Sequence, residues 1–380
     1  MKKTSKTILK WVEDLNKIEL LQDNRVVFAD NLNHWSNGFC RLLYLTSQEA
    51  KKLIEEIVEA ASKLYEKRFY ELENEEKINV LKDGVKNFFR LGDNDAINNN
   101  MLGVNGPCNH LSRIIYENHI HEDKKFGVVG CIDCQHGWLI DTEAPDKRIN
   151  STVNYEVEYF EGSQNKIGYG NYLEQKDWRM EKAHRHLRQI KALLLFFGIE
   201  YKESPNVLDI GSGYGFFRKA VCDAGWKHNG IELSKHASDM CKQEFGFSTY
   251  TGTLEKFCIE TKEQFNIITM WDFIEHVPSP IETLKKISAL MKDGSLCVIR
   301  TPNLLSIERE IFRNHYYSFK REHLQYFSPF SLVSFLEEAD LVPLFLSSES
   351  HLLKGFFKNN IQIFSSLLKG SDLFLIAQKK

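Results

Sequence analysis

The 380-residue sequence lacks the features that would place a chain in a membrane or outside the cell. No apolar run reaches the roughly 18 to 20 residues that a membrane-spanning helix needs. The positively charged start is not followed by an apolar core, so a secretory signal is not expected. The eight cysteines are scattered, which argues against a disulfide framework. These absences predict a protein of the reducing cytoplasm with no membrane span.

The sequence also has little net charge. Its 49 basic and 52 acidic residues leave a formal charge of -3, whereas proteins that bind nucleic acid usually carry a basic excess or stripe. The nearest approach to a stripe, residues 179–188, also contains an acid and is typical of a solvated helix face. No nucleic-acid partner is therefore expected, and nothing in the composition indicates an oligomeric state.

The length favours two domains. Residues 1–150 are expected to form a mainly helical N-terminal domain, because a capping-type start at 46–50 precedes a helical apolar stripe over 53–64. From residue 151 to 380, strand and helix patterns alternate, which predicts an α/β domain with a parallel sheet. The expected strands are 207–210, 229–232, 248–251, 265–271, 295–300, 341–346 and 372–377, and the expected helices 176–197, 216–224, 237–245, 281–291 and 329–339.

A glycine-rich loop, Gly211-Ser-Gly-Tyr-Gly215, joins the first of these strands to a helix. Glycines at this point let the backbone turn tightly and approach a ligand closely. Glu232 lies 21 residues after Gly211 (232 − 211), at the end of the second strand. A carboxylate in that position can accept both hydroxyls of a ribose. The unit therefore predicts a cofactor that contains a nucleoside.

The loop does not have the spacing of a phosphate-binding loop. Its third glycine comes one residue too early for the dinucleotide fingerprint, because Phe216 occupies that position, and no Gly-Lys-Ser/Thr follows. Asp209 would be poorly placed beside a pyrophosphate but well placed beside a cationic amino acid. S-adenosylmethionine (SAM) carries an ammonium and a sulfonium group, so this charge favours SAM. A fortuitous glycine turn with surface acids is the alternative.

On these segments the chain resembles the class I SAM-dependent methyltransferases over roughly residues 155 to 380. Thr253 stands where that family often has an acid beside the adenine. Segment 322–329 resembles the branch that contains the ubiquinone-type O-methyltransferases and many small-molecule and glycan methyltransferases. The matching segments are the first motif (207–215), the end of the second strand (230–234), the adenine turn (252–255), the fourth strand and its loop (265–278) and the turn at 291–296.

The resemblance implies a Rossmann-like, seven-stranded, mostly parallel sheet with helices on both faces, following the mainly helical N-terminal region. Residues 151–198 would form a lid segment, in which Tyr159, Tyr169 and Tyr172 either cover SAM or pack in the core. The residues expected to contact SAM are Asp209, Gly211, Ser212, Gly213, Gly215, Glu232, Leu233, Thr253, Leu254, Trp271, Asp272 and Tyr172.

Three residues are candidates for the chemical step. His276 follows the fourth strand, at the edge of the sheet where ligands bind in open α/β folds, and an imidazole can take a proton from an acceptor hydroxyl. Glu275 precedes it, and His323 is a second candidate base or substrate contact. The alternatives are a structural histidine in the first case and a surface histidine in the second.

The sequence contains two candidate metal sites. Asp272, Glu275 and His276 resemble a cluster that holds a divalent metal such as magnesium in ubiquinone-type O-methyltransferases, although the two acids could simply line the cofactor pocket. The second site is a degenerate zinc-ribbon element at 105–140. There Cys131 and Cys134 form a C-x-x-C motif, and Cys108 lies upstream. Asn105 and Leu111 occupy the two positions at which a cysteine paired with Cys108 would be expected. The histidines that could substitute are His110, His119, His121 and His136; otherwise the pair is vestigial.

The sequence therefore predicts an enzyme, a SAM-dependent methyltransferase. The expected acceptor is a small molecule or glycan, methylated on a hydroxyl, with carbon and nitrogen acceptors left open. Two other classes remain: a protein or nucleic-acid methyltransferase, which would need a binding groove beside the SAM site, and a non-catalytic SAM-binding module.

Overall fold

The structure is a computed structural model. It describes residues 106–108, 113–121, 124–131, 134–141, 148–149, 157–161, 172–306, 308–309, 316–349, 368 and 370–380. The chain divides into two compact units. The first unit contains Met1–Ser151, Thr301–Ser334 and Phe345–Leu375, and the second contains Thr152–Arg300, Phe335–Leu344 and Ile376–Lys380. The expected helical stripe at 53–64 lies outside the described residues.

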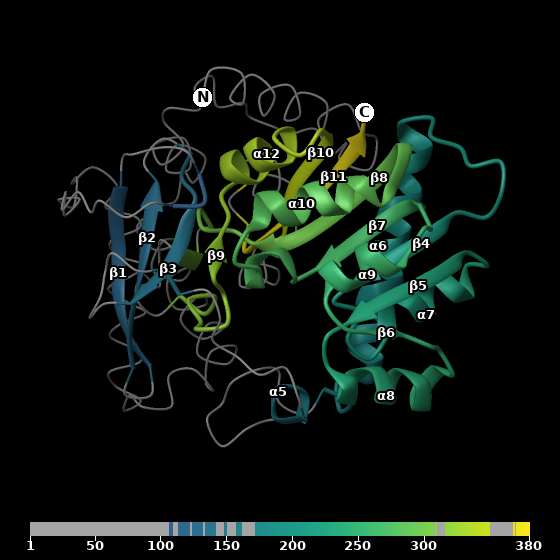
Figure 1. Ribbon diagram of the computed structural model, residues 1–380, viewed down its shortest axis with the longest axis horizontal. Coiled ribbons are helices and arrows are strands. Elements are labelled where there is room, and N and C mark those ends of the chain that lie inside the picture. Colours follow the sequence, from purple (N-terminus) through teal and green to yellow (C-terminus); the bar gives the residue numbers. More distant parts are fainter. Residues whose placement is uncertain are drawn as a thin grey trace, which may run out of the picture. The chain divides into compact units, whose positions relative to one another are not determined.

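The second unit contains the larger part of a twisted sheet with the strand order β10-β11-β8-β7-β4-β5-β6 (Figure 1). The central strand β4 pairs in parallel with β5 and with β7, and the parallel pairing continues to β6 and β8. The strand bounds are β4 Asn206–Ile210, β5 Lys227–Glu232, β6 Tyr250–Thr251, β7 Phe265–Trp271, β8 Met291–Pro302, β10 Leu341–Glu349 and β11 Asp372–Lys379. The predicted seven-stranded, mostly parallel sheet is confirmed.

Helices cover both faces of this sheet (Figure 1). Helices α6 and α7 lie on one face, and α9 and α10 on the other, so the apolar runs of β4 and β7 are buried on both sides. The helix bounds are α5 Val157–Glu161, α6 Lys176–Phe196, α7 Phe216–Asp223, α8 Lys235–Phe245, α9 Leu254–Glu260, α10 Pro280–Ala289 and α12 Pro329–Glu337.

Local sequence explains where two of these helices begin. The Ser234 hydroxyl accepts a hydrogen bond from the backbone N–H of Ala237 at 3.1 Å and caps α8, and Thr253 caps α9 in the same way through Lys256. Both caps directly follow strand ends. As a result Glu232 and Thr253 stand at the carboxyl edge of the sheet.

The first unit contains a four-stranded sheet, in the order β1 (Arg113–His121), β2 (Lys124–Cys131), β3 (Gly137–Asp141) and β9 (Gln325–Tyr326). All three pairings are antiparallel. Strand β9, which pairs with β3, lies in the segment Thr301–Ser334 of the first unit. This pairing joins residues nearly 200 positions apart and leaves no periodic signal in the sequence. The domain bounds 1–150 and 151–380 stay a prediction.

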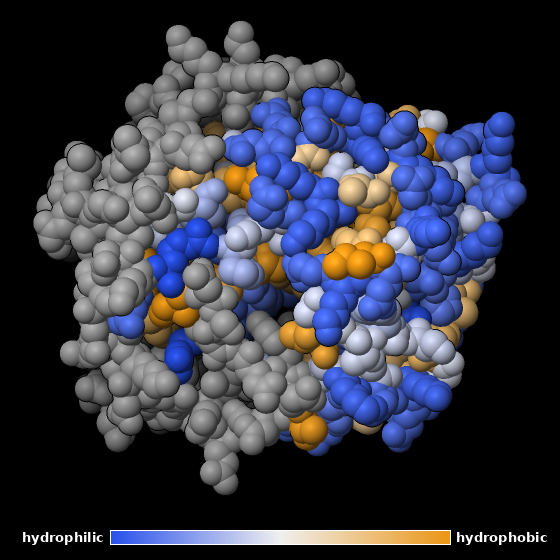
Figure 2. All heavy atoms as spheres, viewed as in Figure 1, coloured by the Kyte–Doolittle hydropathy of each residue, from blue (hydrophilic) through white to orange (hydrophobic). Residues whose placement is uncertain are grey.

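The described surface carries mostly hydrophilic side chains on the face shown in Figure 2, with smaller apolar patches between them. Among the described residues, no helix is both long and apolar enough to cross a membrane. This agrees with the absence of long apolar runs in the sequence.

Candidate functional site

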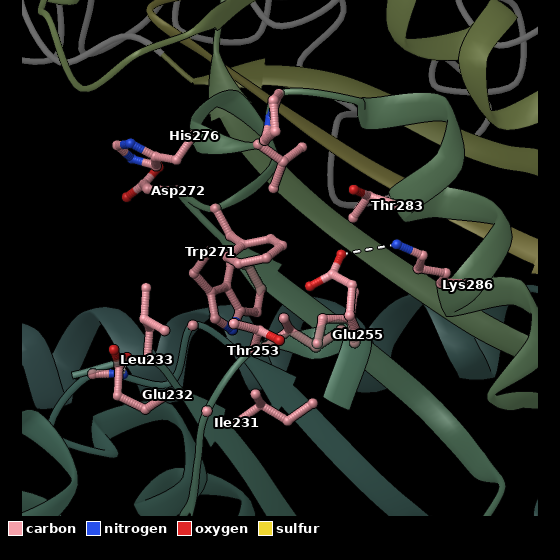
Figure 3. A pocket seen from close by; sticks show the side chains of 18 of the residues that line it. Ile231, Glu232, Leu233, Thr253, Glu255, Trp271, Asp272, His276, Thr283 and Lys286 are labelled. Carbon is pink, nitrogen blue, oxygen red and sulfur yellow. Dashed lines mark hydrogen bonds and ion pairs between the residues drawn. The ribbon is translucent and has the colours of Figure 1, made fainter. Parts of the chain in front are cut away.

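The second unit contains a cavity of about 520 Å³ at the carboxyl ends of β4, β5 and β7 (Figure 3). A volume of this size suits a small-molecule ligand. A smaller cavity of about 90 Å³ shares four lining residues with it and is also lined by Asp209 and Ser212. Of the residues predicted as site residues, the larger cavity is lined by Tyr172, Gly211, Gly213, Glu232, Leu233, Thr253, Leu254, Trp271, Asp272 and His276.

The glycine loop forms one wall of both cavities. Gly211, Gly213 and Gly215 have φ angles of 70°, 51° and 84°, which side chains rarely adopt. A Cβ on Gly215 would lie 2.4 Å from the Cys241 Sγ, and one on Gly211 would lie 2.9 Å from the Phe273 ring. Gly215 lines neither cavity, so its role is to let α7 pack closely against α8.

Glu232 ties the loop to the end of β5. Its Oε2 accepts a hydrogen bond from the backbone N–H of Gly213 at 2.8 Å, and its Oε1 accepts one from Ser234 at 2.9 Å. The side chain is buried yet lines the larger cavity. Each carboxylate oxygen has a second lone pair, so two ligand hydroxyls could bind without breaking these bonds.

Asp209 lies on β4 beneath the loop and is only 2% exposed. The Thr269 hydroxyl donates to its Oδ1 at 2.7 Å. Burial raises the pKa of this carboxyl to about 7, because charge is disfavoured where water is excluded. A cation entering the smaller cavity would stabilise the ionised form.

This pKa makes cofactor affinity depend on pH. We expect calorimetric affinity for SAM to rise about 10-fold from pH 5.5 to about 7, with a proton released on binding, because protonated Asp209 carries no charge to attract a cation. Asp209→Asn should bind weakly with a nearly flat profile over this range. A wild-type profile as flat as that of the variant would contradict the assignment.

The raised pKa of Asp209 also makes the folding stability depend on pH, but in the opposite direction to the affinity for SAM. The pKa of Asp209 is higher in the folded protein than in the unfolded chain, where it is about 4. The stability that its protonated form contributes is therefore present below about pH 4 and is lost as the pH rises through about 7. Thermal unfolding of the ligand-free protein should show this loss, and Asp209→Asn should reduce it.

The end of β7 provides the opposite wall. Trp271 stacks on His186 with ring centroids 4.2 Å apart, and Asp272 follows with a left-handed φ of 54°. Arg300 donates to one carboxylate oxygen of Asp272, and the Lys182 Nζ lies 3.8 Å from the other. Because both oxygens face cations, Asp272 does not fit the role of a magnesium ligand.

His276 and Glu275 lie in the short 3₁₀ helix η3 (Ile274–His276) that follows. The His276 Nε2 is 4.0 Å from the Glu275 Oε1, and the Glu275 side chain is buried behind it. Figure 3 shows His276 beside Asp272 at one end of the cavity. His323 is buried within the first unit and does not line the cavity. The catalytic roles of these residues remain predictions.

Two groups of cavity residues were not singled out as site residues in the sequence, although Glu255 ends the matched segment 252–255. Glu255 of α9 and Lys286 of α10 form an ion pair at 2.8 Å that lines the larger cavity (Figure 3), and this pairing lowers the pKa of Glu255. Arg179 and Lys182 of α6 line the smaller cavity. Nothing in the spacing of these residues indicates a site, because only the sheet topology brings the three helices to one edge.

A separate cluster of three thiols lies in the first unit. The Sγ atoms of Cys108, Cys131 and Cys134 all lie within 4.8 Å of one another. A tight turn holds the pair, since the Cys131 N–H donates to the carbonyl of His136 at 2.7 Å and the Gln135 N–H to that of Cys131 at 2.8 Å. This geometry fits three of the four ligands of a tetrahedral zinc ion.

The structure tests one of the expected fourth ligands. The His136 Nε2 lies 3.0 Å from the Gln325 Oε1, and its Nδ1 lies 3.3 Å from the Ser331 hydroxyl. Burial lowers the pKa of His136 to about 4, so it is held neutral between these partners. Both ring nitrogens of His136 thus face protein partners, and His136 is not among the residues grouped with the three thiols. His110 and the side chains of His119 and His121 lie outside the described residues.

Comparisons with known proteins find similarity to methyltransferases over part of the chain. Residues 181–344 match the model of a methyltransferase domain. The ubiquinone biosynthesis O-methyltransferase of Vibrio parahaemolyticus is 27% identical over 134 residues, which cover 33% of this chain and 57% of that protein. Its counterpart from Glaesserella parasuis is 31% identical over 109 residues, covering 26% and 45%. The chain thus spans about half the length of these curated relatives.

Among solved structures, a SAM-dependent methyltransferase from Archaeoglobus fulgidus aligns with a TM-score of 0.41 at 20% identity. The alignment covers 55% of this chain and 99% of that one.

Proposed function

We propose that this chain, which belongs to the class I SAM-dependent methyltransferases, transfers the methyl group of SAM to a hydroxyl of a small molecule or glycan. The observation that supports SAM as the methyl donor is the pair of buried carboxylates flanking the glycine loop. Glu232 lines the larger cavity and Asp209 the smaller one. A ribose and a cationic amino-acid group are the two chemistries that such a pair would recognise.

The reaction is an in-line displacement in which SAM supplies an activated methyl group. The acceptor oxygen forms a bond to the methyl carbon while the carbon–sulfur bond breaks and its electron pair stays on sulfur. In such a reaction the protein mainly holds donor and acceptor in line. We assign His276 as the base that takes the hydroxyl proton, with Glu275 behind it to stabilise the resulting imidazolium.

Oxygen as the acceptor atom is supported by the relatives, which are O-methyltransferases. A protein or nucleic-acid substrate and a purely SAM-sensing role remain the competing functions. No observation on the described residues favours either of them.

Calorimetric titration with SAM and S-adenosylhomocysteine tests the donor. Micromolar or tighter binding of both is expected, and the absence of binding to the intact chain would overturn the proposal. Incubation of the protein with SAM and fractionated small-molecule and glycan extracts, read by product mass, tests the acceptor. A gain of one methyl on a hydroxyl compound supports the proposal, whereas methylation only of protein or nucleic acid contradicts it.

We also propose that Cys108, Cys131 and Cys134 hold a structural zinc ion, with the fourth ligand supplied from outside the described residues. Metal analysis of the purified chain should find about one zinc per molecule, because three buried thiols fit no other partner as well. Cys134→Ser should lose most of this zinc. Cys222→Ser, at an exposed cysteine, is the matched control and should keep it.

A further inference from the structure

The short helix α5 packs against the glycine loop. Its Phe160 ring stacks on Tyr214 of that loop with centroids 5.2 Å apart, and it meets the Tyr172 ring edge-on at 5.4 Å. The backbone N–H of Tyr172 also donates to the Phe160 carbonyl at 3.0 Å. Tyr159 and Phe160 both line the larger cavity. Helix α5 therefore forms part of the wall of that cavity.

Helix α5 is too short to hold its own conformation. It contains five residues, whereas an isolated helix shorter than about 12 to 15 residues is at best marginally stable in water. Contacts with other elements must therefore keep it in place. The aromatic contacts of Phe160 are one such set, and a polar cluster at the end of the helix is a second.

This polar cluster joins three segments of the second unit. The His236 Nε2 lies 3.1 Å from the Glu161 Oε1 and 2.9 Å from the Tyr214 hydroxyl. Glu161 ends α5, Tyr214 belongs to the glycine loop, and His236 lies in the first turn of α8. One Nε2–H can serve both oxygens, so a single imidazole connects α5 to the loop.

The cluster is built to hold α5 reversibly. The Tyr214 side chain is buried, but the His236 side chain is 18% exposed and that of Glu161 is 53% exposed. A pair with one partner half in water contributes little to stability and breaks at low cost. None of the three residues is among those that line the two cavities. Their bonds therefore act on the position of α5 and not on a ligand.

We propose that Glu161, His236 and Tyr214 form a latch that holds α5 in the cavity wall and sets how fast the cofactor enters and its product leaves. This assignment rests on the proposed function. Because the latch residues do not line the cavity, their bonds should stabilise the docked helix equally with and without a bound cofactor. Weakening the latch should then speed both entry and release, and leave the affinity nearly unchanged.

Stopped-flow tryptophan fluorescence with S-adenosylhomocysteine tests this, since Trp271 lines the cavity. His236→Leu should raise the association and dissociation rates together by about 3- to 10-fold, the effect of one partly exposed hydrogen bond to a charged group. The Kd should change by less than about twofold. Glu161→Gln should raise both rates by about two- to fivefold. The double variant should be no faster than His236→Leu, because both residues act through one contact.

Two further variants separate this positioning role from a structural one. His236→Gln keeps an N–H donor near the position of Nε2 and should return both rates to near the wild-type values. Lys235→Met removes the neighbouring charge of α8, which lies 2.7 Å from Asp239 on the same helix, and should change neither rate.

The outcomes of this experiment are distinguishable. Unchanged rates in His236→Leu or in Glu161→Gln would overturn the latch. A weakened affinity with an unaltered association rate would also overturn it and would make His236 a structural part of the cavity wall. Failure of the wild type to bind S-adenosylhomocysteine would instead overturn the proposed function.

Discussion

Replacing His276 with alanine should lower the rate of methyl transfer about 100- to 10,000-fold, the range that removal of a general base produces. The affinity for S-adenosylhomocysteine should change by no more than about threefold, because His276 lies at the end of the cavity away from Glu232 and Leu233 (Figure 3). The physical reason is that no other imidazole of the second unit lines the larger cavity among the described residues.

Single-turnover kinetics with an identified acceptor provide the measurement, alongside thermal unfolding of the ligand-free variant. His184→Ala is the matched control, since His184 lies on α6 with its side chain 37% exposed, 3.9 Å from Asp223. Undiminished turnover in His276→Ala would remove His276 as the base. A reduced rate explained fully by a lowered unfolding temperature would make it a structural histidine.

Glu232→Gln should weaken S-adenosylhomocysteine binding about 100-fold or more. The substitution keeps the volume of the side chain but replaces one acceptor oxygen with an amide that donates. It thereby loses a charge-assisted bond to a ribose hydroxyl, which contributes about 1.5 to 3 kcal/mol to binding. It also loses the bond to the backbone N–H of Gly213 or Ser234 that holds the loop in position for the ligand.

Calorimetry measures this change, and Glu263→Gln, at an exposed glutamate, is the control. Binding within about twofold of wild type in Glu232→Gln would contradict the placement of the ribose. Because both carboxylate oxygens bond backbone amides, the ligand-free variant should also unfold at a lower temperature than the control.

The sequence predicted the central strands closely because burial on both faces makes them continuous apolar runs. The expected strand 265–271 coincides with β7, and the expected helix 216–224 differs from α7 by one residue. Helix α9 was missed because its seven residues are too few for a helical period to stand out. Strand β9 was missed because its two residues are ordered by β3, far away in the chain.

The site divides in the same way. The glycine loop and Glu232 could be predicted because their spacing reflects one continuous strand–loop–helix–strand unit. The position of Arg179 and Lys182 in a cavity could not be predicted. A basic helix face has the same sequence pattern whether it faces solvent or a cavity. Asp272 was recognised by its position, but its pairing with Arg300 depends on the register between β7 and β8.

The two backbone bonds of Glu232 have a thermodynamic consequence. They hold the glycine loop in its final conformation without a ligand, so ordering this loop need not oppose binding. The heat-capacity change on cofactor binding should then reflect the apolar surface of the cofactor and its cavity alone, with no folding contribution from the loop. Another nucleoside bound in the same cavity should give a heat-capacity change in proportion to the apolar area that it buries.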